Sequence, residues 1–224
     1  MLLKKEVAMK AASWITITIV TAFYIIAFIF YPKMPEQMAS HWNAQSAVDG
    51  YMSRFLGLFL FPFIATGLTL LFIAIPLIDP LKSNIAKFRK YYDWFVVLFL
   101  LFFQYLYVLT ILWNKNISFD LMRALLPATG ILFFYIGIMV LNAKRNYLVG
   151  IRTPWTLASD EVWNRTHLCG GRLLMAAGII AAIGAIWPKY GLIFILVPIL
   201  LVTLVSVVYS YVIYRKLTKI KLSC

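Results

Sequence analysis

Six apolar segments, each of about 20 residues, dominate the chain and constrain its fold more than any other feature. They cover about residues 12–31, 55–78, 93–113, 122–142, 172–188 and 190–214. A helix of about 20 residues crosses the hydrocarbon core of a bilayer. With 63% hydrophobic and 13% charged residues, the chain has more apolar surface than a soluble fold of 224 residues can bury. We therefore expect an all-α integral membrane protein, a bundle of about six transmembrane helices.

Basic residues gather at alternate ends of these segments. Of the 21 lysines and arginines, 16 lie at the N-terminus, in the second and fourth connections and at the C-terminus. Because cytoplasmic loops retain positive charge, this alternation predicts a multi-pass plasma-membrane protein with both termini in the cytoplasm. The net charge of +13 is then explained by contact with anionic membrane lipids, and we expect no direct binding of nucleic acid.

Small residues recur along the fifth segment. Ala177, Ala181 and Ala185 are spaced by four, and Gly178 lies beside them. Small side chains at this spacing let two membrane helices approach closely. The pattern therefore predicts helix packing rather than a pore.

The connection after the first segment holds one of the two histidines. His41, Trp42, Asn43 and Asp49 bring an imidazole, an indole, an amide and a carboxylate together on the outer side. Asp49-Gly50 is a turn signal. Three interpretations remain open: a solvated turn with its indole on the headgroups, a binding surface for an extracellular ligand, or a metal site, for which these ligands form a weak set.

The fourth connection, on the inner side, holds a second polar motif. Arg152, Thr153 and Trp155 stand close together in the run Arg-Thr-Pro-Trp-Thr. An arginine with neighbouring hydroxyls suits a carboxylate or phosphate. Equally, the arginine can extend to lipid phosphates while the indole anchors at the interface. Both interpretations stay open.

A short helix of about residues 160–169 should follow this motif. Ser159 is a good N-cap, and acidic residues in the first turn complement the helix dipole. Trp163 and His167 should share a face with Asp160, while Glu161 and Arg165 form an i, i+4 pair. We expect this helix to lie on the cytoplasmic surface or in a cavity between spans. We expect Gly170-Gly171 to break it before the fifth span.

These motifs support a family resemblance. The run 150–157 and the run 159–167 together resemble the C-terminal signature of the SdpI immunity-protein family. The outer segment, with Pro35, His41-Trp42-Asn43 and Asp49-Gly50, is similar to a domain of unknown function that accompanies this signature. One departure is Ser46, where the family pattern tends to have glycine, so the loop backbone is expected to differ if that glycine has a positive φ. The resemblance covers nearly the whole chain and implies an N-terminal half, 1–115, with three spans and a C-terminal half, 116–224, with three more.

The resemblance also implies a function. Members protect their host from a secreted antimicrobial peptide toxin, and a member of this kind is expected to hold a cytoplasmic repressor protein at the membrane. We expect a non-enzymatic immunity and signalling protein without cofactor or metal. The residues expected to bind ligands are His41, Trp42, Asn43, Asp49, Arg152, Thr153, Trp155, Glu161, Trp163 and His167. The alternatives are a small transporter of a peptide or amphiphile, disfavoured by the scarcity of ionisable residues in the spans, and an intramembrane enzyme, disfavoured because no HExxH occurs.

Overall fold

A computed structural model describes the backbone of residues 2–43 and 46–222 and the side chains of residues 11–43 and 46–219. Six long helices form the bundle: α1 (Leu2–Phe30), α2 (Arg54–Ile78), α3 (Lys82–Asn114), α4 (Leu121–Asn142), α6 (Asp160–Ile183) and α7 (Gly191–Leu222). Each is long and apolar enough to cross a membrane. The predicted all-α membrane fold is confirmed.

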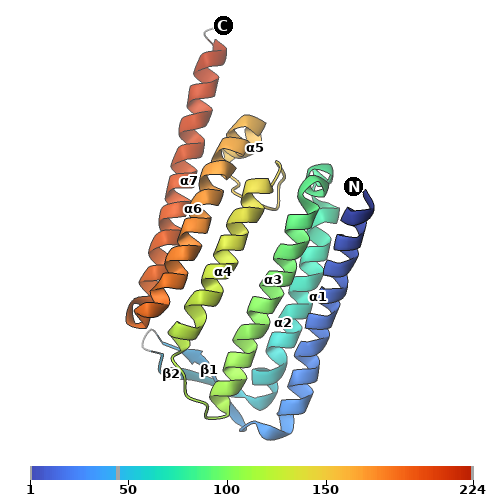
Figure 1. The fold of residues 1–224 in the computed structure, drawn as a ribbon, viewed down its shortest axis with the longest axis vertical. Helices are drawn as coiled ribbons and strands as arrows, with labels where there is room; N and C mark the ends of the chain where they lie inside the picture. Colours follow the sequence, from blue (N-terminus) through green and yellow to red (C-terminus); the bar gives the residue numbers. More distant parts are fainter. Residues whose placement is uncertain (1, 44–45, 223–224) are drawn as a thin grey trace.

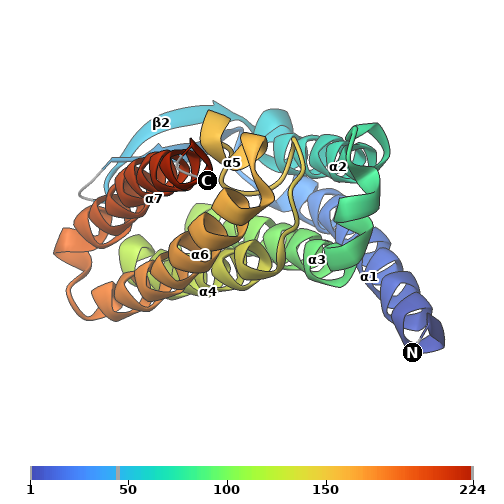
Figure 2. The same cartoon turned by 90° about the horizontal axis from the view of Figure 1, so that it is seen from above.

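The helices run alternately up and down, so both termini lie at one end of the bundle (Figure 1). Seen from above, α1, α2 and α3 form one group and α4, α6 and α7 a second (Figure 2). Helices α3 and α4 join the groups by direct packing. These groups correspond to the predicted halves 1–115 and 116–224, whose status as separate domains stays a prediction.

Shorter elements occupy the two ends of the bundle. At the end opposite the termini lie the 3-10 turn η1 (Tyr31–Lys33) and a hairpin of β1 (Gln37–Trp42) and β2 (Val48–Ser53), with η2 (Gly184–Ile186) and η3 (Pro188–Tyr190) between α6 and α7. The short helix α5 (Pro154–Ala158) lies at the terminal end, beside the start of α6 (Figure 1). The two motifs singled out in the sequence therefore lie at opposite ends of the molecule.

Helix α6 runs without interruption through Gly170 and Gly171, so the predicted helix break is wrong. A side chain at position 171 would have its Cβ 2.9 Å from the carbonyl oxygen of Gly137 on α4. Glycine is needed here for close packing between two membrane helices and not for a turn. Gly178 likewise lies against α4, where its Cβ would be 2.5 Å from the carbonyl oxygen of Gly130, and the predicted small-residue packing is confirmed.

Candidate functional site

The outer segment folds as an antiparallel hairpin, with Met38 opposite Met52 and Ala39 opposite Tyr51. The strands lose regular register on both sides of His41. Such irregularities are β-bulges, which twist a strand locally and redirect side chains. The motif foreseen as a loop is thus a strand pair with a defined backbone.

The hairpin turns at Asn43 rather than at Asp49-Gly50, so the predicted turn position is wrong. The backbone N–H of Asn43 donates to the carbonyl of Ala47 at 2.9 Å, and the Asn43 side-chain oxygen accepts the N–H of Ala47 at 3.0 Å. Ser46 adopts a left-handed backbone with φ of 61°. Serine at this position therefore adopts the positive φ that glycine favours, and whether the loop backbone differs from that of the family stays a prediction.

Gly50 lies in β2 because it makes room for His41. A Cβ at position 50 would lie 2.9 Å from the Cβ of His41 on the opposite strand. The imidazole Nδ1 of His41 then reaches the Oδ1 of Asp49 at 2.5 Å. The side chains of this pair are 72% and 45% exposed, so imidazole and carboxylate form a polar group that a ligand can reach from outside the bundle.

Contacts with α2 and α3 fix the hairpin to the bundle. The side-chain amide of Asn114, the last residue of α3, accepts the N–H of Ala39 at 2.7 Å and donates to its carbonyl at 3.1 Å. Met38 is fully buried against Gly57 near the start of α2, where a Cβ would lie 2.7 Å from its sulfur. Trp42 packs edge-on against Trp113 of α3, and its indole N–H is buried without an acceptor among the described residues. Of the four predicted outer residues, His41 and Asp49 are exposed at the surface, Asn43 shapes the turn and Trp42 attaches the hairpin.

The inner segment is an ordered loop built around buried Asn146. Its side-chain oxygen accepts the N–H groups of Leu148 at 3.0 Å and Val149 at 2.6 Å. Its amide donates to the carbonyls of Lys144 and Val149, each at 2.8 Å. One side chain thereby satisfies four backbone groups of a segment that has no regular secondary structure.

Two predicted ligand-binding residues of α6, Trp163 and His167, instead hold this loop from within. Their rings stack with centroids 3.9 Å apart, and both are almost fully buried. Trp163 donates its indole N–H to the carbonyl of Ala143 at 2.9 Å. His167 Nε2 accepts the N–H of Ile151 at 3.1 Å, so Nδ1 carries the proton and donates to the carbonyl of Trp163 at 2.9 Å. The imidazole is therefore neutral, with both nitrogens occupied.

Gly150 completes this contact. It has a φ of 117°, and a Cβ there would lie 2.5 Å from His167 Nε2 and 3.2 Å from the Trp163 ring. Only glycine combines this backbone conformation with such a close approach. The close approach of His167, 17 residues later in the chain, thus explains why the predicted motif begins with glycine at position 150.

Thr153 is a helix cap and not an open anion ligand. Its hydroxyl accepts the N–H of Thr156, the Thr156 hydroxyl accepts the N–H of Thr153, and both side chains are buried at the start of α5. Thr153 also donates to the hydroxyl of Ser210 on α7 at 3.0 Å. Hence the predicted fork of Arg152 with neighbouring hydroxyls is not formed by Thr153.

Three predicted inner residues remain accessible. Arg152 is exposed and donates through Nη1 to the carbonyl of Tyr147 at 2.7 Å. Half-buried Trp155 packs against Tyr211 of α7, with ring centroids 5.1 Å apart. Glu161 pairs with Arg165 at 2.6 Å, as predicted. Ser159 caps α6 through the N–H of Val162, which also confirms the prediction.

Two polar residues that the sequence interpretation did not select connect the inner loop to α2 and α3. Asp79, almost fully buried at the end of α2, accepts the N–H of Leu81 at 2.7 Å and that of Tyr147 at 2.9 Å. Asn84 of α3 donates to the carbonyl of Arg145 at 2.8 Å. The sequence does show a carboxylate, Asp79, in a short turn between two spans. It does not show that the partner of this carboxylate is the backbone of Tyr147, 68 residues away.

Sequence comparisons match both motifs. The SdpI/YfhL protein family matches residues 142–210, and a domain of unknown function (DUF1648) matches residues 17–66. The chain is 27% identical over 204 residues to "Immunity protein SdpI" of Bacillus subtilis, covering 91% of this chain and 96% of that protein. The chain therefore resembles the SdpI family over its C-terminal region and the immunity protein over most of its length. No solved structure matches it.

The two regions matched by the family models contain the two candidate sites. The range 17–66 includes the hairpin and the first half of α2, and the range 142–210 includes the inner loop, α5, α6 and Ser210. Helix α3, which contacts both sites, lies outside both ranges. The ligand-binding roles of the ten selected residues stay predictions.

The two histidines lie too far apart to share a metal ion. His41 belongs to β1 at one end of the bundle, and His167 belongs to the first half of α6 at the other (Figure 1). No group of three His, Cys, Asp or Glu side chains within residues 11–43 and 46–219 has a spacing that suits a metal.

Proposed function

We propose that this protein confers resistance to a secreted antimicrobial peptide as a multi-pass membrane immunity protein. The observation that carries the proposal is its similarity to the Bacillus subtilis immunity protein, which extends over 91% of this chain. The charge distribution supports an orientation with both termini and the inner loop in the cytoplasm. The hairpin then faces the medium from which a secreted peptide arrives.

The outer hairpin is the proposed peptide site. Its His41–Asp49 pair offers a donor and an acceptor side by side on an exposed, bulged strand pair. The hydrogen bonds from Asn114 and the burial of the Met38 side chain fix β1 to the bundle. The His41–Asp49 pair therefore lies on a strand whose position is fixed. A preorganised site loses less conformational entropy when it binds.

The inner loop is the proposed response site. Arg152, Trp155 and Glu161 present a cation, an indole and a carboxylate at the terminal end of the bundle. These are the groups through which a cytoplasmic repressor protein would be held at the membrane. Buried Thr153, Trp163 and His167 act as positioning residues, because their polar atoms bind the loop itself.

Helices α2 and α3 provide the connection between the two sites. Each contacts the hairpin at one end, through Gly57 and Asn114, and the inner loop at the other, through Asp79 and Asn84. A peptide that favoured one position of the hairpin over another would therefore act on the inner loop through both helices. Such coupling requires that the peptide bind the two arrangements with different affinity.

Replacement of the Bacillus subtilis immunity protein tests the proposal. Cells that carry this chain in its place are challenged with the toxin-producing parent strain, and survival is compared with that of cells carrying no immunity protein. We expect protection at equal membrane levels of the two proteins. If the chain is inserted in the membrane but gives no protection, a hybrid is tested in which residues 32–53 of this chain are replaced by the corresponding outer segment of the relative. Failure of both proteins contradicts an immunity function.

A further inference from the structure

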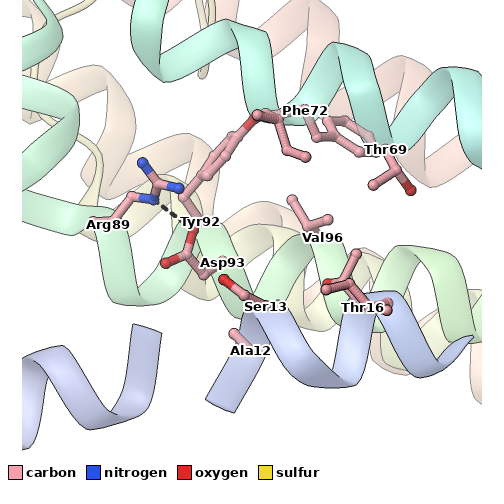
Figure 3. A pocket seen from close by; sticks show the side chains of 11 residues that line it. Ala12, Ser13, Thr16, Thr69, Phe72, Arg89, Tyr92, Asp93 and Val96 are labelled. Carbon is pink, nitrogen blue, oxygen red and sulfur yellow. Dashed lines mark hydrogen bonds and ion pairs between the residues drawn. The ribbon is translucent and has the colours of Figure 1, made fainter. Parts of the chain in front are cut away.

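A cavity of about 140 Å³ opens between α1, α2 and α3 (Figure 3), and none of the residues that line it belongs to either candidate site. It lies toward the end of the bundle that carries the termini. Two turns of α1, one turn of α2 and the stretch of α3 after Phe88 surround it, and α3 departs from helical backbone at Phe88 with φ of −117°. The volume accommodates several water-sized groups or one small polar headgroup.

An ion pair forms the polar part of the cavity wall. Arg89 Nε lies 2.5 Å from Asp93 Oδ1, one turn further along α3, and the two side chains are only 31% and 13% exposed. Thr16 lines the wall of the cavity that α1 forms, and Thr69 lines the wall that α2 forms (Figure 3). Tyr92 donates its hydroxyl to the carbonyl of Phe72 at 2.8 Å and thereby braces α3 against α2.

The cavity lies at the depth of lipid headgroups. The apolar span of α1 begins at Ala11, so Thr16 and Ile17 are within about 9 Å of its start at a rise of 1.5 Å per residue. Arg89 and Asp93 directly precede the apolar run that begins at Trp94. Ionisable side chains at this depth are costly unless they serve a site or a partner.

Apolar side chains show from which direction the cavity is entered. Ile17 of α1 and Ile73 of α2 line it and are 55% and 54% exposed, on surfaces that face the hydrocarbon of a membrane. An occupant that enters between them must have apolar chains to cover both. A membrane lipid meets this condition, and a water-soluble ion does not.

From this arrangement we propose that the cavity binds the headgroup of a zwitterionic aminophospholipid such as phosphatidylethanolamine. The guanidinium of Arg89 and the hydroxyl of Thr16 donate hydrogen bonds to the phosphate oxygens, while the carboxylate of Asp93 binds the ammonium. The acyl chains extend over Ile17 and Ile73. An anionic headgroup without an amine would leave Asp93 without a positive partner on the lipid, so the paired charges favour a neutral zwitterion over phosphatidylglycerol.

Lipid titration of the purified full-length protein tests the proposal. Phosphatidylethanolamine and phosphatidylglycerol with identical acyl chains are added to the protein in detergent, and bound lipid is counted by native mass spectrometry. We expect one phosphatidylethanolamine to be retained in preference to phosphatidylglycerol. Asp93→Asn should weaken phosphatidylethanolamine binding by about tenfold or more and shift the preference toward phosphatidylglycerol, because Arg89 is left unpaired.

Matched variants separate binding from folding. Asp160→Asn removes the carboxylate of another ion pair, with Arg145 at 2.7 Å on the inner loop, and should leave the lipid preference unchanged. Thr16→Leu narrows the cavity without touching the ion pair and should also weaken phosphatidylethanolamine binding, which keeps the test decisive if Asp93→Asn does not fold.

Three results would overturn the proposal. The first is equal retention of both lipids by the wild-type protein. The second is an unchanged preference in folded Asp93→Asn or Thr16→Leu. The third is displacement of the lipid by soluble glycerophosphoethanolamine at the same concentration, which would make the occupant a water-soluble zwitterion rather than a lipid.

Discussion

The carboxylate of Asp79 at the end of α2 accepts the backbone N–H of Tyr147 at 2.9 Å, although 68 residues separate them. Its other oxygen accepts the N–H of Leu81 in the turn toward α3. This one side chain therefore ties the inner loop of the second helix group to the first group.

Replacing Asp79 by asparagine should destabilise the protein. The amide that replaces one carboxylate oxygen cannot accept, so a buried N–H loses its partner, at a cost of about 2 kcal/mol in the free energy of unfolding. Thermal unfolding of the detergent-purified protein measures this loss. Asp120→Asn is the control, because exposed Asp120 caps α4 and asparagine caps a helix equally well. Equal melting temperatures for the two variants would contradict the role of Asp79.

A side chain at Gly150 should disrupt the inner loop. Gly150→Ala places a Cβ against His167 Nε2 and forces a φ that costs about 1–3 kcal/mol outside glycine, so we expect a lower melting temperature and loss of protection. Gly67→Ala, at an exposed position of α2, is the matched control, because no atom lies within 4 Å of the added Cβ. That variant should unfold at or above the wild-type temperature. A Gly150→Ala protein as stable as Gly67→Ala would show that the loop tolerates a different backbone.

The outer pair should act as a unit. His41→Ala and Asp49→Ala each remove half of one exposed pair, so each should abolish protection while the membrane level of the protein stays near wild type. The double variant should be no worse than either single variant, as expected for residues with one shared role. Survival under toxin challenge is the measurement. Full survival of both single variants would remove the hairpin pair as the peptide site.

Asn43→Ala should behave differently from the exposed pair. Its side-chain oxygen holds the N–H of Ala47 in the hairpin turn, so the variant should reduce protection by loosening the turn. Faster proteolysis of the hairpin in intact cells, compared with His41→Ala, checks this. Identical cleavage rates would show that the amide has no structural role there.

At the inner end, Arg152→Lys should separate recognition from charge. Lysine keeps the positive charge but loses the planar donors, one of which binds the carbonyl of Tyr147. We expect normal membrane insertion and reduced function. Arg215→Lys, at an exposed position of α7, is the control and should retain function. Wild-type survival of the Arg152→Lys cells would leave Arg152 as an interfacial lipid anchor.

Cysteine labelling should establish the orientation. In a variant with Cys169 and Cys224 replaced by serine, a cysteine at exposed position 51 should react with a membrane-impermeant maleimide on intact cells. A cysteine at position 147, also exposed, should react only after permeabilisation. The reverse pattern would place the hairpin in the cytoplasm and contradict the proposed peptide site.

Much of the architecture follows from the sequence because it depends on local composition. Each span is a property of about 20 consecutive residues and their solvent, the lipid. The cap at Ser159 and the Glu161–Arg165 pair likewise depend on neighbours within one turn. Such features need no knowledge of which helices meet, and they were predicted correctly.

The sites were decided by contacts between distant segments. The sequence suggested that Asp49-Gly50 forms a turn, but Gly50 is required by His41 on the other strand. It also suggested that Gly170-Gly171 ends a helix, but close contact with α4 favours glycine inside one.

The sequence therefore determined a bundle of six spans with two polar motifs at alternate ends. Only the tertiary structure decided that Gly150 packs against His167, that Asp79 binds the backbone of Tyr147 and that Arg89 and Asp93 line a cavity. The physical reason is that each buried polar group must find a partner wherever the fold supplies one, and local spacing does not specify that partner.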